Sequence, residues 1–200
     1  TNLETAELIK YASNAFLAVK ISFINEMALL AEKTGANIQE ISRAMGMDER
    51  IAPKFLHPGP GYGGSCFPKD TQAIVDIAHK HDEEMMVIKA AISANQKQKE
   101  KMVEKICFAL SGSGNLQDKS IAVLGLSFKP ETDDLREAPS IDIIRGLVRA
   151  GASIRAYCPA GIPEARWRLA DLADSIEYAQ NEYTAVKRAD ALVLITEWNQ

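Results

Sequence analysis

The chain has 200 residues, of which 46% are hydrophobic and 25% charged, and its formal net charge is −4 at pH 7. This composition is that of an ordinary soluble globular protein, and the length suits one large domain or two small ones. The acidic balance argues against nucleic acid as a partner, because no basic patch is present to neutralise phosphates. No apolar run approaches the roughly 18 uncharged residues of a membrane span, and no signal peptide is visible.

Residues 3–33 predict one long helix, in which apolar side chains occupy almost every face of AFLAVKISFINEMALLAE. A helix that is apolar all round is expected to be buried, either in a core or against a partner subunit. Gly35 is placed to end this helix, because a glycine just past a helix adopts the left-handed conformation at little cost.

A short helix and an irregular segment follow. Asn37 and Glu40 form a capping-box-like start for a helix that ends at Gly46. Residues 52–65 are rich in proline and glycine, so no regular structure is expected there.

Two more helices complete the first half. One begins near Pro68, with proline in its favoured first turn, and runs to about His79. Asp82 is placed to cap a long helix over residues 83–109. The glycine- and serine-containing stretch 111–118 then interrupts the pattern and is interpreted as a flexible linker.

Short apolar segments alternate with helical ones in the last third of the chain. They are strand 120–126, helix 139–150, strand 153–158, helix 163–173, helix 181–188 and strand 190–196. Alternation at this spacing predicts a doubly wound parallel sheet. Only Gly125 follows the first strand, so the GxGxxG fingerprint of dinucleotide binding is absent from this sheet.

The predicted fold class is therefore α plus α/β. Residues 1–110 form an all-helical domain that carries a cysteine-containing loop, residues 111–118 are a linker, and residues 119–200 form a Rossmann-like domain.

Three cysteines, Cys66, Cys107 and Cys158, are far apart, odd in number and without CxxC spacing. This pattern predicts neither a disulfide framework nor a metal site, and it indicates a reducing, cytoplasmic compartment. Cys107 and Cys158 are interpreted as small core residues.

Cys66 lies in GYGGSCFPKD, residues 61–70. Glycines allow a ligand to approach bare backbone N–H groups, and the positive end of the following helix favours a thiolate. Asp70 would share a face with Cys66, where its carboxylate could position or deprotonate a water. A turn followed by a capped helix is the alternative interpretation.

A cysteine hydrolase would need a histidine base, and His57, His79 and His81 are poorly placed to supply one. A thiol without a histidine suits attack on an aldehyde better, since a cofactor can then remove hydride from the adduct.

Two further pairs of residues are candidates for binding. Lys10 and Asn14 lie four residues apart in the long first helix and could donate hydrogen bonds to an oxyanion, although Lys10 could simply reach solvent. Lys129 and Arg136 follow the first strand, at the sheet edge where such folds bind ligands, and are suited to phosphates. The alternative for this second pair is a solvated charged loop.

Nearly the whole chain resembles the nucleotide-sugar 6-dehydrogenases, and most closely those that act on UDP-glucose. The matching stretches are TAELIKYASNAFLAVKISFINE, GMDERI, KFLHPGPGYGGSCFPKD, LGLSFKPETDDLRE and DALVLITEW. The third stretch is the most specific. These enzymes oxidise a sugar CH₂OH to a carboxylate with two NAD⁺.

The resemblance implies that Cys66 is the nucleophile, which captures the aldehyde as a thiohemiacetal and then carries a thioester that water hydrolyses. It implies that Lys10 and Asn14 stabilise oxyanions, and that Asp70 helps to activate water. Lys69 and Arg136 are implied to face the NAD phosphates. The residues implied to contact the substrate are Lys10, Asn14, Arg50 (from the neighbouring subunit), Phe55, Leu56, His57, Pro58, Gly59, Gly61, Tyr62, Gly63 and Lys129.

The resemblance also implies a homodimer formed through the long first helix. Family members carry an additional amino-terminal Rossmann domain with a GxGxxG loop and a catalytic glutamate, which this sequence lacks. The chain is therefore expected to be a piece of a longer enzyme and not to oxidise substrate alone. Cys158 stands where the family pattern has an aspartate, which puts the role of that position in doubt.

Two alternatives remain open. The substrate could be GDP-mannose or a UDP-N-acetylhexosamine, although the phenylalanine and lysine of SCFPKD favour UDP-glucose. The chain could instead be a non-catalytic dimerisation and nucleotide-binding module that keeps these motifs by descent.

Overall fold

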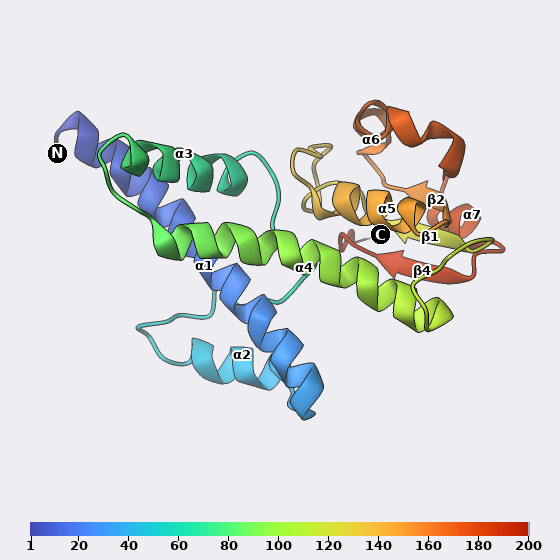
Figure 1. Ribbon diagram of the computed structural model, residues 1–200, viewed down its shortest axis with the longest axis horizontal. Helices are drawn as coiled ribbons and strands as arrows, with labels where there is room; N and C mark the ends of the chain where they lie inside the picture. Colours follow the sequence, from blue (N-terminus) through green and yellow to red (C-terminus); the bar gives the residue numbers. More distant parts are fainter. Residues whose placement is uncertain (200) are drawn as a thin grey trace. The chain divides into compact units, whose positions relative to one another are not determined.

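The computed structural model describes residues 1–199 and divides into two compact units, Thr1–Gln98 and Lys99–Gln200 (Figure 1). The helices and strands are α1 (Leu3–Thr34), α2 (Ile38–Gly46), α3 (Phe67–His79), α4 (Met86–Ser111), β1 (Ser120–Leu124), α5 (Pro139–Arg149), β2 (Ser153–Tyr157), α6 (Ile162–Arg168), the 3-10 helix η1 (Ala170–Ser175), β3 (Ile176–Tyr178), α7 (Glu182–Val186) and β4 (Ala191–Leu194). The predicted order of a helical region and then a parallel sheet is confirmed. The boundary between the units falls inside α4.

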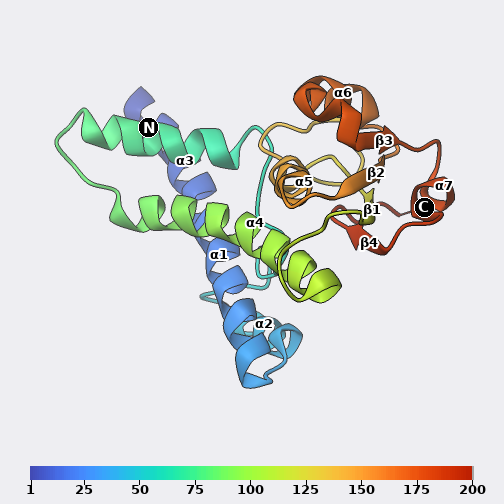
Figure 2. The same cartoon turned by 45° about the vertical axis from the view of Figure 1, so that its right-hand side comes forward.

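The first unit is organised around α1. Asn2 caps its start by accepting a hydrogen bond from the Thr5 N–H, and Gly35 ends it in the predicted left-handed conformation, with φ at 74°. Figures 1 and 2 show α3 beside the amino-terminal half of α1 and α2 beside its other end. The Ser22 hydroxyl in α1 donates to the Ala91 carbonyl in α4, at 3.1 Å. Three helices are thus anchored on α1.

The start of α4 differs from the expectation. Asp82 does not cap it, because α4 begins at Met86. Asp82 has a left-handed φ of 59°, and the Glu83 N–H donates to the Ala78 carbonyl at 3.0 Å. This is the geometry that ends a helix, so Asp82 completes α3 instead of starting α4.

The second unit is a four-stranded parallel sheet with strand order β3-β2-β1-β4. β1 lies in the middle, and Ile121 pairs with Ile154 on one side and with Ala191 on the other. β1 is buried over Ile121–Val123, as expected of an inner strand of a parallel sheet, whereas β4 at the edge is partly exposed. The core also includes residues of α5 and of the second half of α4, among them Ile144 and Cys107.

Two details of this unit were not predicted. β3 has only three residues, Ile176–Tyr178, which is too short for its alternation to stand out in the sequence. The helix predicted over 163–173 ends at Arg168, and a separate 3-10 segment with a kink at Leu172 follows it.

Gly125 lies where β1 ends, with φ at 82°. A Cβ at this position would lie 2.5 Å from the Thr196 carbonyl oxygen, just beyond β4. The glycine is therefore required by the close packing of two chain segments as well as by its backbone conformation.

Replacing Gly125 with alanine should destabilise the second unit more than replacing Gly114, whose φ of 85° is similar but which has nothing within 4 Å. Gly114→Ala should cost about 1–2 kcal/mol of unfolding free energy for the left-handed conformation. Gly125→Ala should cost about 1–3 kcal/mol more from overpacking. Both tryptophans, Trp167 and Trp198, belong to this unit, so urea unfolding followed by their fluorescence measures the difference. An equal loss of unfolding free energy in the two variants would show that the packing of Gly125 against Thr196 does not contribute to stability.

Candidate active site

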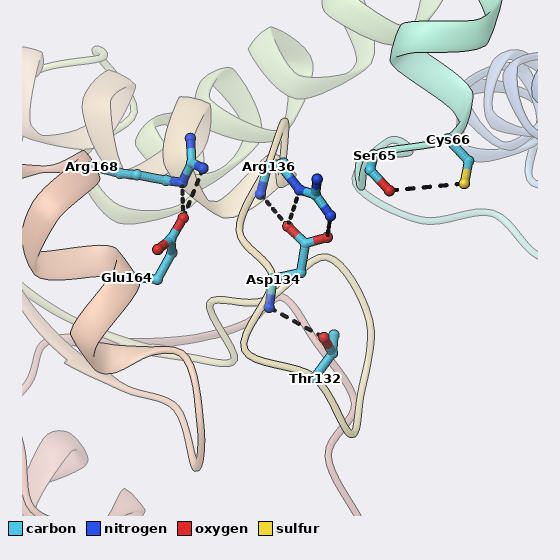
Figure 3. Close-up of polar contacts among 7 residues, drawn as sticks. All are labelled: Ser65, Cys66, Thr132, Asp134, Arg136, Glu164 and Arg168. Carbon is cyan, nitrogen blue, oxygen red and sulfur yellow. Dashed lines mark hydrogen bonds and ion pairs between the residues drawn. The ribbon is translucent and has the colours of Figure 1, made fainter.

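Cys66 lies at the amino-terminal end of α3, as the sequence predicts. It precedes Phe67, the first residue of the helix, and Pro68 occupies the first turn. The Asp70 N–H donates to the Cys66 carbonyl at 2.8 Å, which is the first helical hydrogen bond. The thiol is exposed, and its sulfur lies 3.8 Å from the Ser65 hydroxyl (Figure 3).

Asp70, one turn further along α3, is fully buried and joins three cationic or amide groups. Its Oδ2 accepts a hydrogen bond from Asn14 Nδ2 at 2.6 Å and lies 3.2 Å from Lys10 Nζ. Its Oδ1 accepts from Lys69 Nζ at 2.5 Å. The structure therefore brings together four of the residues singled out in the sequence, from two different helices.

These contacts shift the pKa values of Asp70 and Lys69. Burial by itself would raise the pKa of the Asp70 carboxyl, but the hydrogen bonds from Lys69, Asn14 and Lys10 outweigh it, and the pKa lies below its usual value. The hydrogen bond to Asp70 raises the pKa of Lys69. At neutral pH the cluster is thus a buried carboxylate held between two ammonium groups.

The loop that precedes Cys66 has no regular structure, as predicted. Phe55 has a φ of 65°, and its ring contacts that of Phe67, with centroids 5.8 Å apart. The Tyr62 ring packs edge-on against the same Phe67 ring at 5.9 Å. The predicted substrate-contacting positions of the loop are buried at Leu56, Tyr62 and Gly63, exposed at Phe55 and His57, and intermediate at Pro58, Gly59 and Gly61.

Buried polar side chains hold this loop, and sequence reasoning missed them. Asn25 of α1 accepts from the Gly59 N–H at 2.8 Å, and Gln98 of α4 donates to the Gly59 carbonyl at 2.8 Å. Asn95 of α4 bonds both backbone groups of Tyr62. The only sign of them in the sequence is that uncharged amide residues occur within predicted helices. Amides on the exposed face of a helix give the same pattern, so the sequence does not show that these are buried.

Arg50 lies beyond α2, with its side chain 89% exposed, and binds Asp48 of its own turn through two guanidinium nitrogens. Within this chain it is thus a surface cation held by a neighbouring carboxylate.

Lys129 and Arg136 belong to the loop that follows β1 in the second unit. Lys129 is exposed, with its ammonium group 5.3 Å from the centre of the Phe128 ring. Arg136 makes a two-pronged contact with Asp134, with Nη2 2.7 Å from Oδ2 (Figure 3). This contact keeps the pKa of the Asp134 carboxyl below its usual value. The Phe128 N–H also donates to the Asp134 carbonyl, so the loop folds back on itself.

A hollow lies at the carboxyl ends of β1, β2 and β4, the edge where open α/β sheets bind ligands. Its lining includes Tyr157, Pro159, Glu182 and Trp198. Sequence reasoning pointed to this edge through the neighbouring charged loop, but not to these residues.

Cys158 is 1% exposed and lies at the end of β2. Burial would raise the pKa of this thiol, but backbone N–H groups of Leu126, Ser127, Gly161 and Ala160 point at the sulfur and lower the pKa overall. The surroundings of Cys158 thus suit an anion.

Comparison with known proteins identifies the family. Residues 4–97 match the central domain of the UDP-glucose/GDP-mannose dehydrogenase family, and residues 122–200 match the UDP binding domain of the same family. The chain therefore belongs to the UDP-glucose/GDP-mannose dehydrogenase family, as the sequence motifs predicted.

Individual relatives agree with this assignment. The chain is 49% identical over its whole length to UDP-glucose 6-dehydrogenase of Rhizobium meliloti (strain 1021), covering 44% of that protein. It is also 46% identical to UDP-glucose 6-dehydrogenase TuaD of Bacillus subtilis (strain 168). That alignment of 198 residues covers 99% of this chain and 42% of the relative. The structure of a UDP-glucose dehydrogenase from Pyrobaculum islandicum superimposes with a TM-score of 0.85 at 38% identity, over 97% of this chain and 44% of that one. The chain thus spans less than half the length of these relatives.

The low pKa of Asp70 predicts a specific acid sensitivity. Because the folded-state pKa lies below the unfolded value of about 3.9, the stabilisation is complete above about pH 4 and is lost as the pH falls through the folded-state pKa. Asp70→Asn should reduce the unfolding free energy at neutral pH by about 1–3 kcal/mol and flatten its dependence on pH below about pH 4. Urea unfolding followed by circular dichroism between about pH 2 and pH 7 measures both. If the unfolding free energy of the variant fell with acid as steeply as that of the parent chain, the lowered pKa would not belong to Asp70.

Proposed function

We propose that this chain is the nucleophile-bearing and nucleotide-binding part of an enzyme that oxidises UDP-glucose to UDP-glucuronate. The observation that carries the proposal is the exposed thiol of Cys66 at the start of α3, one turn before a buried carboxylate that holds Lys10 and Asn14. The family membership of the chain supports the same reaction.

Cys66 adds through its sulfur to the aldehyde carbon of the half-oxidised sugar and forms a C–S bond. The resulting thiohemiacetal loses hydride to give a thioester, and water then displaces the sulfur to release the carboxylate. The position ahead of α3 assists, because the positive end of the helix dipole stabilises the oxyanions that form beside the sulfur.

Lys10 and Asn14 donate hydrogen bonds to those oxyanions. Their contacts with the Asp70 carboxylate fix both side chains, so little reorganisation is needed when charge develops. A carboxyl with a lowered pKa is a weak base, so we assign Asp70 the task of orienting the attacking water and its two partners.

The glycine-rich loop binds the nucleotide sugar along Phe55–Gly63. At Gly59 there is no neighbouring atom within 4 Å of where a Cβ would be, so a ligand can approach the backbone there. Arg50, whose side chain is 89% exposed, is available to a sugar bound on a neighbouring subunit. Lys129 provides an exposed cation for the substrate from the second unit.

NAD⁺ supplies the chemistry of hydride acceptance in both oxidation steps. The chain has suitable cations for its phosphates in Lys69 and Arg136, whose side chains are 62% and 58% exposed. Gly125, by contrast, is packed against Thr196 and lacks the rest of a phosphate-binding fingerprint. We therefore assign no dinucleotide site to the β1 turn.

A cytoplasmic location fits the three cysteines, all of which are free thiols. By length and composition alone α1 could also cross a membrane. A third of its most apolar window (33%) is buried within this chain, and core helices of soluble proteins pass the same test.

The substrate proposal is tested by a thermal-shift titration with UDP-glucose, UDP-glucuronate, UDP-N-acetylglucosamine and GDP-mannose. A ligand that binds only the folded chain raises the melting temperature. At a free ligand concentration of 100 times the dissociation constant, it adds about 2.7 kcal/mol to the unfolding free energy. We expect shifts with UDP-glucose and UDP-glucuronate alone. A shift with GDP-mannose alone would contradict the proposal that UDP-glucose is the substrate. No shift with any of the four ligands would contradict the proposal that this chain binds a nucleotide sugar.

We further propose that α1 pairs with α1 of a second copy to form a homodimer. Four large apolar side chains, Ile9, Phe16, Phe23 and Leu30, are 45% to 63% exposed. They repeat every seven residues and therefore form one stripe along the helix. An apolar stripe of this regularity is typical of a helix that packs against another helix.

A charge in this stripe should separate the dimer. Phe16→Glu places an ionised carboxylate at the centre of the proposed interface, which should weaken association by at least about 100-fold, because an unpaired buried charge costs several kcal/mol. Sedimentation equilibrium measures the association, and Glu7→Ala, an exposed position on the opposite side of the same helix, is the matched surface control. A parent chain that sediments as a monomer, or a Phe16→Glu variant that remains dimeric, would contradict the interface.

A further inference from the structure

The loop before Cys66 has an unusual backbone environment. It has no regular structure, so its peptide groups have no partners in a helix or sheet. Several of them are nevertheless bonded by buried side chains. The Ser42 hydroxyl donates to the Leu56 carbonyl at 2.5 Å, and the remaining bonds come from Asn25, Asn95 and Gln98. We call these three amide side chains the amide clamp.

Asn95 makes the most specific contact of the clamp. Its Oδ1 accepts from the Tyr62 N–H at 2.8 Å, and its Nδ2 donates to the Tyr62 carbonyl at 3.0 Å. The carbonyl and the NH₂ of the Asn95 amide thus both bond the backbone of Tyr62, as the backbone of a neighbouring β-strand would. Asn95 is 7% exposed, so water cannot readily replace these bonds.

Gly59 is held from two helices at once. Its N–H donates to Asn25 of α1, and its carbonyl accepts from Gln98 of α4. The side of Gly59 where a Cβ would project is open. The loop is therefore fixed through its polar backbone groups while the surface that a side chain would cover is left bare.

A glycine-rich loop needs such fixing. Glycine loses more conformational freedom on ordering than any other residue, and each ordered residue costs about 1–2 kcal/mol. The loop cannot recover this through its own side chains, because glycines bury little apolar area. Amides supplied by the helices satisfy buried N–H and C=O groups that would otherwise be unpaired.

We infer that the amide clamp positions the nucleotide-sugar loop and, through Tyr62, the thiol of Cys66. Asn95, Asn25 and Gln98 are positioning residues, which act by holding the backbone in its binding geometry before the substrate arrives. Tyr62 lies only four residues before Cys66. Fixing its backbone therefore limits where the thiol can lie. The inference rests on the proposed function, since it assigns a nucleotide sugar to this loop.

Asn95→Asp tests the clamp through pH. The protonated acid reproduces the amide, because its carbonyl accepts from the Tyr62 N–H and its hydroxyl donates to the Tyr62 carbonyl. The ionised form instead places a second oxygen against that carbonyl. At about pH 8.5 the variant should bind UDP-glucose about ten-fold more weakly than the parent chain, because one buried hydrogen bond is lost. At about pH 5.5 binding should return to within about three-fold, since burial raises the pKa of the carboxyl.

Three further measurements make the test specific. Amide hydrogen exchange at Tyr62 and Gly59 should accelerate in Asn95→Asp at the higher pH only, relative to the parent chain at the same pH. Asn95→Leu, which makes neither bond, should bind weakly at both pH values. Lys97→Ala, an exposed position on the same helix, should match the parent chain throughout.

The outcomes separate the two levels of the proposal. Parent-like binding and parent-like exchange at Tyr62 in both Asn95 variants would overturn the clamp while leaving the substrate assignment intact. A parent chain that binds no UDP-glucose would overturn the substrate. In that case exchange at Tyr62 and the rate of Cys66 alkylation by iodoacetamide, compared between the parent chain and Asn95→Asp at both pH values, would still decide whether the clamp holds the loop.

Discussion

The buried carboxylate of Asp70 is the contact on which the geometry of the candidate site depends. It is a charge removed from water on α3, and such a charge is tolerated only when it is fully paired. Its partners come from α1 and from the adjacent residue of α3, so the need to pair one carboxylate sets the position of α3 relative to α1. The thiol one turn earlier follows from that position, because Cys66 begins the same helix.

The glycine-rich loop beside this cluster is held by a different kind of interaction. Binding a ligand against bare backbone requires glycines, and glycines make a chain flexible. The first unit reconciles the two by placing amide side chains of α1 and α4 on the loop's peptide groups. Electrostatic pairing thus fixes the helices, and neutral hydrogen bonds fix the loop. The two networks meet at the short segment that carries the thiol.

The sequence is informative wherever the pattern is long or local. The 32-residue α1, its Gly35 terminus and the α3 start at Cys66 follow from periodicity and from the positions of glycine and proline. The four-residue spacing of Cys66 and Asp70 likewise shows that they share a helical face.

What could not be predicted is mostly non-local. Asn14 meets Asp70 across 56 positions, and Asn95 meets Tyr62 across 33. No spacing rule reaches that far, and a buried amide in ANQKQKE looks like any solvated one. The sequence prediction that Asp82 starts α4 is wrong because an aspartate can start one helix or end another, and the choice depends on a backbone hydrogen bond from the Glu83 N–H to the Ala78 carbonyl.

Among the described residues β4 pairs only with β1, so its outer edge carries unpaired peptide groups, and Leu192 and Leu194 are 54% and 64% exposed. An apolar, open edge accepts another strand of matching alternation. In a longer polypeptide that strand could come from the same molecule, whereas at high concentration it would come from a neighbour. Loss of material by strand-to-strand aggregation should therefore begin at β4, and a lysine at position 192 would be the simplest protection.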